Sequence, residues 1–192
     1  MADPTSHLIH ALEKIQNLDE ATITYMVSLC HATNFPKKSF LLQPGEKADK
    51  LYFIAQGLVM QRYLEAETGK AVSFHFEGDF VTSFESFLNN SPSEYCLQTL
   101  EDSTLLYWTL ADYNFFLGTH PNAKLASLSF TQELFYREFK SKSRLISYTP
   151  EKLYRFILEK EPQLIQRVPL LYIAEYMGIS NEHLSRIRKK IR

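Results

Sequence analysis

The C-terminal part of the chain has apolar residues at helical spacing in two short segments. A first stripe, with Ile173, Ala174 and Met177, runs from Pro169 to about Met177, and Pro169 suits the first position of a helix. A second stripe follows Ser180 and consists of Leu184, Ile187 and Ile191. Gly178 suits the left-handed residue that ends a helix, and Ser180 suits the N-cap of the next one. The pattern predicts a helix-turn-helix.

Between Phe35 and Leu110 the apolar positions change to short alternating runs that are typical of strands. Turn residues such as Pro44-Gly45 and Gly78-Asp79 separate these runs. The runs are 39–43, 50–55, 58–64, 71–76 and 95–110. Many short strands at this spacing predict a β-barrel, jelly roll or sandwich.

The run 71–76 alternates most regularly. Val72, Phe74 and Phe76 alternate with Ser73, His75 and Glu77. We therefore expect the three apolar side chains on a buried face and the three polar ones on a wet face.

Helical spacing returns on either side of the strands. Residues 7–31 are expected to be helical, and a long helix is expected after Pro121. Its a/d seam consists of Leu125, Leu128, Gln132, Phe135, Phe139 and Lys142. A second stripe consists of Ala126, Phe130 and Leu134. One stripe can pack on the strands while the other meets a partner helix; the alternative is a helix buried on both sides within a monomer. Thr149-Pro150 predicts the start of another helix, which Pro162 ends.

Charge divides the chain in the same way. Residues 1–140 carry 10 Lys and Arg against 17 Asp and Glu, a net of −7, whereas residues 141–192 carry 11 against 5, a net of +6. These values agree with the overall charge of −1. A basic C-terminal segment on an acidic body is typical of a nucleic-acid-binding appendage.

Two cysteines, Cys30 and Cys96, allow neither a disulfide framework nor a four-thiolate iron–sulfur or zinc site. The first residues lack the pattern of a signal peptide, and no apolar run has the length of a membrane span. We expect a cytoplasmic protein with no cofactor and no membrane partner.

The second predicted helix has donors on its outer side. Asn181, Arg186, Lys189 and Lys190 form a stripe suited to phosphates and base edges. The structural alternative is a two-helix hairpin with a solvated cationic end, since helices often end in Lys and Arg. Spacing, glycine, cap and charge together favour binding to double-stranded DNA.

The order of strands, seam helix and helix-turn-helix resembles the CRP/FNR family of transcription regulators. The best local matches are Gly45-Glu46 followed by the segment 51–57, then Gly78-Asp79-Phe80, and last the segment 173–189. The resemblance implies an α+β fold with an N-terminal antiparallel, cyclic-nucleotide-binding-type β-roll or jelly roll, a long dimerisation helix and a C-terminal helix-turn-helix domain. The corresponding domains are 1–120, 121–143 and 144–192, and the family's β-hairpin wing would be absent.

The resemblance also implies residue roles. Asn181, Glu182 and Arg186 fall at the base-reading positions of a helix in the major groove. Arg186 can fork onto guanine and Glu182 can accept from the cytosine amino group. Expected phosphate contacts are Ser180, His183, Arg188, Lys189, Lys190 and Arg192. The expected dimer interface is Leu125, Leu128, Gln132, Phe135 and Phe139. Partners would be an inverted-repeat operator, a second copy of the chain and RNA polymerase.

The effector site departs from the family pattern. Members that bind cyclic AMP have Gly-Glu directly after Gly-Asp-Phe and a later Arg that grips the cyclic phosphate, whereas Ser93 or Glu94 falls at the Arg position here. A carboxylate there would repel an anion. The expected pocket residues are Thr82, Ser83, Ser93, Glu94 and Gln132. They favour an unknown effector, or none, over cyclic AMP.

Two other functions are compatible with parts of the sequence. A cupin-type metalloenzyme needs several His and a carboxylate in one cavity, and only His75 and Glu77 share a predicted strand. No nucleophile pair or phosphate loop is apparent, so we expect no enzyme activity. The remaining alternative is a dimeric ligand-sensing or protein-interaction module whose helix-turn-helix is vestigial.

Overall fold

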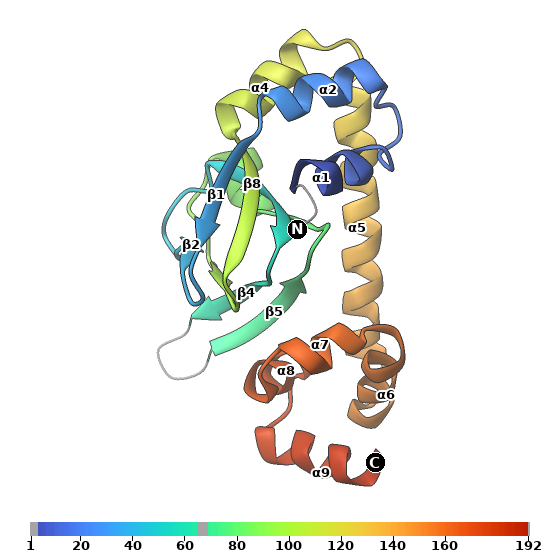
Figure 1. The fold of residues 1–192 in the computed structure, drawn as a ribbon. Helices are drawn as coiled ribbons and strands as arrows, with labels where there is room; N and C mark the ends of the chain where they lie inside the picture. Colours follow the sequence, from blue (N-terminus) through green and yellow to red (C-terminus); the bar gives the residue numbers. More distant parts are fainter. Residues whose placement is uncertain (1–3, 65–68, 192) are drawn as a thin grey trace.

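The computed structural model describes residues 4–64 and 69–191. A strand-rich body lies beside one long helix, and short helices follow at its C-terminal end (Figure 1). The helices are α1 Pro4–Leu12, α2 Glu20–Ser28, α3 Phe84–Asn89, α4 Leu110–Thr119, α5 Ala123–Ser147, α6 Pro150–Lys160, α7 Pro162–Arg167, α8 Leu170–Met177 and α9 Asn181–Ile191. The strands are β1 His31–Phe35, β2 Phe40–Leu42, β3 Lys50–Gln56, β4 Val59–Leu64, β5 Gly69–His75, β6 Phe80–Val81, β7 Cys96–Thr99 and β8 Ser103–Thr109.

The strands form the antiparallel β-roll that the sequence predicts. One four-stranded sheet has the order β1-β8-β3-β6 and the other has the order β2-β7-β4-β5. In the first sheet Tyr52 lies between Tyr107 of β8 and Val81 of β6. Strands distant in sequence are therefore neighbours, which gives the two sheets a common interior.

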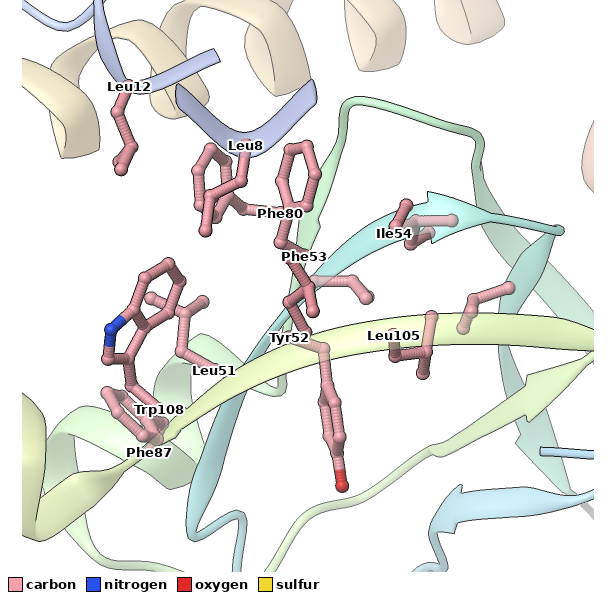
Figure 2. Packing of buried hydrophobic residues seen from close by; sticks show 14 of the residues in the cluster. Leu8, Leu12, Leu51, Tyr52, Phe53, Ile54, Phe80, Phe87, Leu105 and Trp108 are labelled. Carbon is pink, nitrogen blue, oxygen red and sulfur yellow. The ribbon is translucent and has the colours of Figure 1, made fainter. Parts of the chain in front are cut away.

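The interior of the roll is apolar and extends to the first helix. Phe53, Leu105 and Trp108 are buried together with Leu8 and Leu12 of α1 (Figure 2). The indole nitrogen of Trp108 donates to the Met26 carbonyl at 2.8 Å, which satisfies its buried N–H group. Each fully buried large side chain contributes about 1.5–3 kcal/mol to stability. The N-terminal helices are thus part of the body's core.

The N-terminal region corrects the expectation of one helix over residues 7–31. Two helices, α1 and α2, lie there, and β1 already begins at His31. Asp19 is the reason for the break, because its side chain accepts from the Thr22 amide at 2.8 Å and starts a new helix. Asn17 in the connection has a φ of 68°.

Strand β5 corrects the expected division into a buried and a wet face. His75 is buried, whereas Val72 and Phe74 are only partly buried. Both faces of the strand are covered, because the helix-turn-helix region packs on one of them. There the ring of Phe74 meets that of Tyr176 at 5.7 Å, edge to face.

The long helix α5 runs from Ala123 to Ser147 and not over residues 121–143. Its Ala126 is buried against the roll, and Phe130 packs edge-on against Phe80. The seam stripe lies on the other side and is exposed, so the alternative of a helix buried on both sides does not hold in the single chain. The exposed fractions are 55% for Leu125 and Leu128, 70% for Phe135 and 60% for Phe139.

A second buried cluster joins the C-terminal helices to the roll. It contains Leu58, Met60 and Phe76 from the roll together with Ile157 of α6 and Ile173 of α8. Pro162, expected to end the preceding helix, also starts the short α7. The C-terminal helices therefore pack directly on the sheet that contains β5.

Candidate nucleic-acid interface and effector site

The helix-turn-helix forms as the sequence predicts, with α8 and α9 joined by a short turn. Gly178 has a φ of 67° and ends α8 in the left-handed conformation, and the Ile179 amide donates to the Ala174 carbonyl at 3.0 Å. The Ser180 hydroxyl accepts from the His183 amide at 3.1 Å and so caps α9. Pro169 lies one residue before α8, as its N-cap.

The inner face of α9 fixes its position. Leu184 and Ile187 are buried among Ile173 and Ala174 of α8 and Ile157 of α6. Helices of this length are marginal alone in water, so this packing holds them. With the inner face anchored, the opposite face of α9 is directed to solvent.

The outward surface of α9 contains the three predicted base-reading residues. They share it with Ser185 and Lys189, which lie on the same side of the helix and are also exposed. We call Asn181, Glu182, Ser185, Arg186 and Lys189 the recognition face. Ser185 was not predicted, because a hydroxyl among charged side chains carries little weight in a sequence; its position four residues after Asn181 was the available indication.

The charges on the recognition face are available for contact. Hydrogen bonds from its own backbone amide and from Ser180 hold the pKa of Glu182 below its ordinary value, so this carboxylate is ionised at neutral pH. Arg186 and Lys189 form no hydrogen bond or ion pair with any residue that the structure describes. The face therefore combines two cationic donors with one carboxylate, beside the amide of Asn181 and the hydroxyl of Ser185.

The predicted phosphate-contacting residues differ in their burial and in their hydrogen bonds. Ser180 caps α9, and His183 and Arg188 are half-buried. Lys190 donates to Glu151 of α6 at 2.7 Å, and this bond lowers the pKa of Glu151. Lys189 is exposed, and Arg192 lies outside the described residues.

The predicted effector residues divide into a buried and an exposed group. Thr82, Ser83 and Ser93 are buried, and we call them the hydroxyl cluster. Thr82 donates to the Lys50 carbonyl at 2.8 Å, and the Ser93 hydroxyl bonds Ser83 at 3.1 Å and the Tyr95 carbonyl at 2.9 Å. These hydrogen bonds join the hydroxyl groups to other atoms of the protein.

Glu94 and Gln132 do not join this cluster. Both side chains are exposed, Glu94 next to Ser93 and Gln132 on α5, and neither bonds Thr82, Ser83 or Ser93 in the described part of the chain. The sequence spacing places Ser93 or Glu94 at the position of the family arginine, and of these two the Ser93 side chain is buried and the Glu94 side chain is exposed. The structure therefore brings Thr82, Ser83 and Ser93 together and leaves Glu94 and Gln132 apart from them, and an effector pocket formed by all five stays a prediction.

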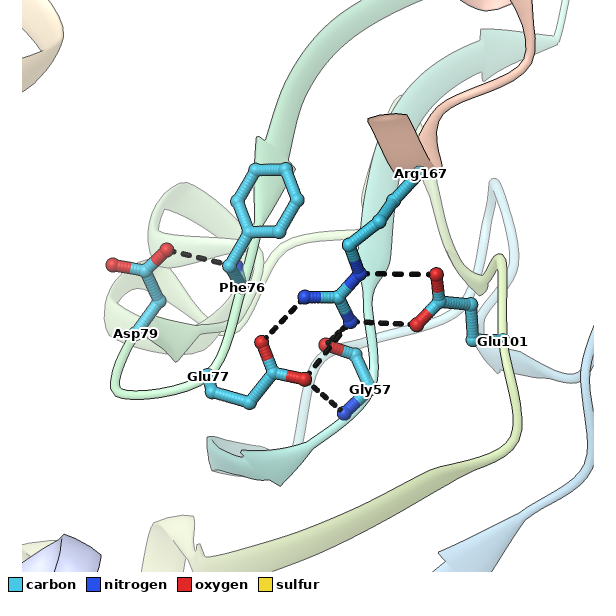
Figure 3. Close-up of polar contacts among 6 residues, drawn as sticks. All are labelled: Gly57, Phe76, Glu77, Asp79, Glu101 and Arg167. Carbon is cyan, nitrogen blue, oxygen red and sulfur yellow. Dashed lines mark hydrogen bonds and ion pairs between the residues drawn. The ribbon is translucent and has the colours of Figure 1, made fainter. Parts of the chain in front are cut away.

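An ion-pair network that was not predicted connects the helix-turn-helix region to the roll. Arg167 at the end of α7 donates to Glu77 at 2.7 Å, to Glu101 at 2.6 Å and to the Gly57 carbonyl at 3.1 Å (Figure 3). Gly57 has a φ of 110°, and a Cβ there would collide with Ser103, so only glycine lets this turn lie beneath the arginine. No sequence pattern connects Arg167 to partners this distant.

Charge assistance makes this network strong. Burial opposes the charge of Glu77, but the bonds from Arg167 and the Gly57 amide outweigh it and hold the pKa of this carboxyl below its ordinary value. A second pair lies nearby: Arg62 of β4 donates to Glu175 of α8 at 2.7 and 2.8 Å. Two arginines thus hold the C-terminal helices on the roll.

Neither cysteine chemistry nor a metal centre is evident in the described residues. Burial raises the pKa of Cys30 to about 11 and also raises that of Cys96, so both thiols are protonated at neutral pH. Among residues 4–64 and 69–191 no group of three or more His, Cys, Asp or Glu is placed to hold a metal ion. The same residues include no helix with the length and apolar character needed to cross a bilayer.

Residues 32–120 match the model of the cyclic nucleotide-binding domain family. The cAMP-activated global transcriptional regulator CRP of Salmonella typhimurium is 38% identical over 64 residues, which are 32% of this chain and 30% of that protein. The protein of the same name from Pasteurella multocida is 35% identical over 63 residues, with the same coverage. The match spans less than a third of the length of these relatives. Both relatives are named as transcriptional regulators.

Solved structures with a similar fold cover most of the chain. The c-di-GMP responsive global regulator CLP of Xanthomonas campestris has a TM-score of 0.69 at 21% identity and covers 90% of this chain and 91% of its own. FixK2 of Bradyrhizobium japonicum has a TM-score of 0.68 at 17% identity and covers 84% of each chain. The catabolite activator protein of Thermus thermophilus has a TM-score of 0.57 at 17% identity and covers 94% of this chain and 86% of its own. At these identities the likeness is one of fold.

Proposed function

Because residues 32–120 match the cyclic nucleotide-binding domain family and the chain has the fold of CRP/FNR-type regulators, we propose that it is a dimeric transcription regulator that binds double-stranded DNA through α9. The observation that carries the proposal is the recognition face. Its free cations lie on the side of α9 opposite to Leu184 and Ile187, so they can enter a groove without any change in the core.

The roles of the recognition face follow from its chemistry. Arg186 donates two parallel hydrogen bonds to a guanine edge, Glu182 accepts from a cytosine amino group, and Asn181 pairs with adenine or the backbone. Lys189 contacts phosphate and contributes affinity without sequence choice. Lys190 can do the same once DNA competes with Glu151 for its ammonium group.

The dimer is proposed to form along the exposed stripe of α5. Leu125, Leu128, Phe135 and Phe139 expose apolar side chains along one side of a 25-residue helix, and the rings of the last two stack at 6.1 Å. Pairing this stripe with that of a second copy removes it from water. Twofold symmetry then requires an inverted repeat with half-sites about 34–36 Å apart.

Cyclic AMP is not proposed as the effector. Ser93 or Glu94 falls at the position of the family's anion-binding arginine, the side chains of the hydroxyl cluster are bonded within the protein, and the acidic residue Glu94 lies beside this cluster. The hydroxyl cluster itself contains no cation, and Glu94 beside it would repel an anionic phosphate.

A vestigial helix-turn-helix is the second candidate, and one observation favours it. Arg167 and Arg62 hold the C-terminal helices on the roll, which would also suit a unit that only makes protein contacts. This candidate predicts a dimer that retains no DNA.

One experiment separates the two candidates. The full chain is incubated at low salt with random duplexes, and the bound sequences are recovered; we expect an inverted repeat. Leu128→Glu combined with Phe135→Glu should yield a monomer in sedimentation and lose the repeat, whereas Lys124→Ala, an exposed change near the start of the same helix, should alter neither. A folded dimer that retains no duplex would overturn DNA binding, and an unchanged dimer in the double variant would remove α5 from the interface.

A further inference from the structure

A polar crevice of about 220 Å³ lies where three parts of the molecule meet. Its walls come from β5, from the second half of α5, and from α7 and α8. In Figure 1 these elements converge below the roll, where the long helix passes the C-terminal helices. The volume is below the range of about 300–1,000 Å³ that suits drug-sized ligands. The crevice therefore suits a small molecule.

The most buried polar group of the crevice is His75, which is 8% exposed. Its Nε2 lies 2.9 Å from the Ser73 hydroxyl, and Ser73 donates its only proton to the Gln61 amide oxygen at 3.1 Å. In the tautomer that keeps both hydrogen bonds, Nε2 carries the proton of the imidazole and Nδ1 is an acceptor. Burial lowers the pKa of His75, so the ring is neutral at neutral pH.

The Nδ1 atom of His75 makes no hydrogen bond to a residue that the structure describes. Among those residues no side-chain nitrogen or oxygen is both fully buried and unpaired, so Nδ1 has accessible surface. Since His75 lines the crevice, this acceptor is available to an occupant.

The cations of the crevice are already paired. Arg137 bonds Asp79 at 2.6 Å, and Arg144 lies 3.6 Å from Glu161. The guanidinium of Arg144 also stacks on Phe156 at 4.6 Å. Neither arginine is left to hold an anion.

Glu138 is the unpaired charge. It lines the crevice from α5 and forms no ion pair or hydrogen bond with any residue in the described part of the chain. With His75 neutral, the lining side chains carry three carboxylates, those of Asp79, Glu138 and Glu161, and two arginines, which leaves one negative charge in excess within the lining. The ammonium of Lys142 lies outside the lining and donates to the Val72 carbonyl at 3.4 Å. The aromatic rings of Phe74 and Tyr176 complete the wall.

We propose that this crevice binds a small organic monocation with N–H groups, such as a primary amine, an amidine or a guanidine. Its N–H donates to Nδ1 of His75, its charge is balanced by Glu138, and its alkyl part lies along Phe74 and Tyr176, whose rings favour a nearby cation. The occupant contacts the roll, α5 and α8 together. Binding is therefore coupled to how the C-terminal helices sit on the roll. The inference does not depend on DNA binding.

The test uses the full chain without DNA and three probes of matched length: n-butylamine, butan-1-ol and butyrate. Calorimetric titration should show saturable binding of butylamine and none of the neutral or anionic probe. Glu138→Gln keeps the shape and removes the charge, and should weaken butylamine binding about tenfold, equivalent to about 1.4 kcal/mol. Glu133→Gln removes one charge from the same helix outside the crevice and should leave binding unchanged.

His75 supplies the second variant. His75→Phe removes the acceptor while keeping a ring, and should weaken butylamine binding in protein whose circular dichroism matches that of the parent. Absence of saturable butylamine binding, equal binding of butan-1-ol, or an equal loss in Glu133→Gln and Glu138→Gln would each overturn the proposal. The proposed DNA binding is untouched by these outcomes, because no duplex is present.

Discussion

The recognition face of α9 and the hydroxyl cluster of the roll are both polar, yet they differ in what their side chains bind. Arg186 and Lys189 form no bond within the described chain, whereas Thr82 and Ser93 are bonded to protein atoms. A polar group that is free can bind a partner at little cost to the fold, and one that is engaged stabilises the fold. Substitutions in the first region should therefore change DNA binding, and those in the second should change stability.

The largest stability effect is expected at Arg167, which binds the C-terminal helices to the roll. Arg167→Ala removes bonds to Glu77, Glu101 and the Gly57 carbonyl, and leaves the exposed carboxylate of Glu77 and the half-buried carboxylate of Glu101 without their shared cation. The free energy of unfolding in urea should fall by about 2–3 kcal/mol. Arg155, an exposed arginine of α6, forms no ion pair within residues 4–64 and 69–191, and Arg155→Ala should stay within about 0.5 kcal/mol of the parent. Equal losses in both variants would show that the network contributes nothing specific.

Arg186 of α9 should show the opposite behaviour to Arg167, because its substitution should change DNA binding and not stability. Arg186→Ala is expected to lose about 1–3 kcal/mol of discrimination at one base pair of the selected duplex, with unfolding unchanged. Lys189→Ala is the matched control, because it should weaken all sequences alike and reduce the salt slope by about one. Competition binding at several salt concentrations measures both. If Arg186→Ala weakened every sequence uniformly, its base-reading role would be wrong.

A smaller stability effect is expected in the hydroxyl cluster. Ser93→Ala removes the bonds to Ser83 and the Tyr95 carbonyl inside a buried site, and should lower the free energy of unfolding by about 1 kcal/mol. Ser185→Ala removes the same hydroxyl from the exposed recognition face and should have no measurable effect on unfolding. An unchanged free energy of unfolding in Ser93→Ala would mean that the hydroxyl cluster does not stabilise the fold.

The smallest effect is a pH dependence that arises from His75. Burial lowers its folded-state pKa from 6.5, and Arg137 adds to this, while Asp79 and Glu138 oppose it. The unfolded chain therefore takes up the proton first as the pH falls, so stability is complete above about pH 6.5 and decreases below it. The decrease between pH 6.5 and 5.5 should be less than about 1 kcal/mol. In His75→Gln this part of the decline should vanish, and an identical decline would exclude His75 as its source.

Helix ends that are fixed by residues close in the sequence could be predicted from the sequence. Gly178 and Ser180 were sufficient for the helix-turn-helix, because a left-handed end and an N-cap act within a few residues. The break at Asp19 was missed, since apolar spacing on both sides of it concealed the cap. Features that depend on packing could not be predicted: β5 is covered on both faces because helices from the far end of the chain pack on it.

In the candidate site, too, some features follow from the local sequence and others depend on packing. The outward position of Asn181, Glu182 and Arg186 depends only on helical periodicity, which a sequence contains. The separation of Ser93 from Glu94 depends on which of two neighbours turns inward, and a one-residue ambiguity in alignment cannot resolve it. Arg167 has partners 66 to 110 positions away, so no local pattern indicates them.

Arg167 joins three separate turns of the roll: that of Gly57 between β3 and β4, that of Glu77 after β5, and that of Glu101 between β7 and β8. The Gly57 amide is itself bonded to Glu77 at 2.8 Å. Detachment of the C-terminal helices should therefore loosen all three turns in one cooperative opening event, and the Gly57 amide should exchange its hydrogen with deuterated solvent at the rate of that event.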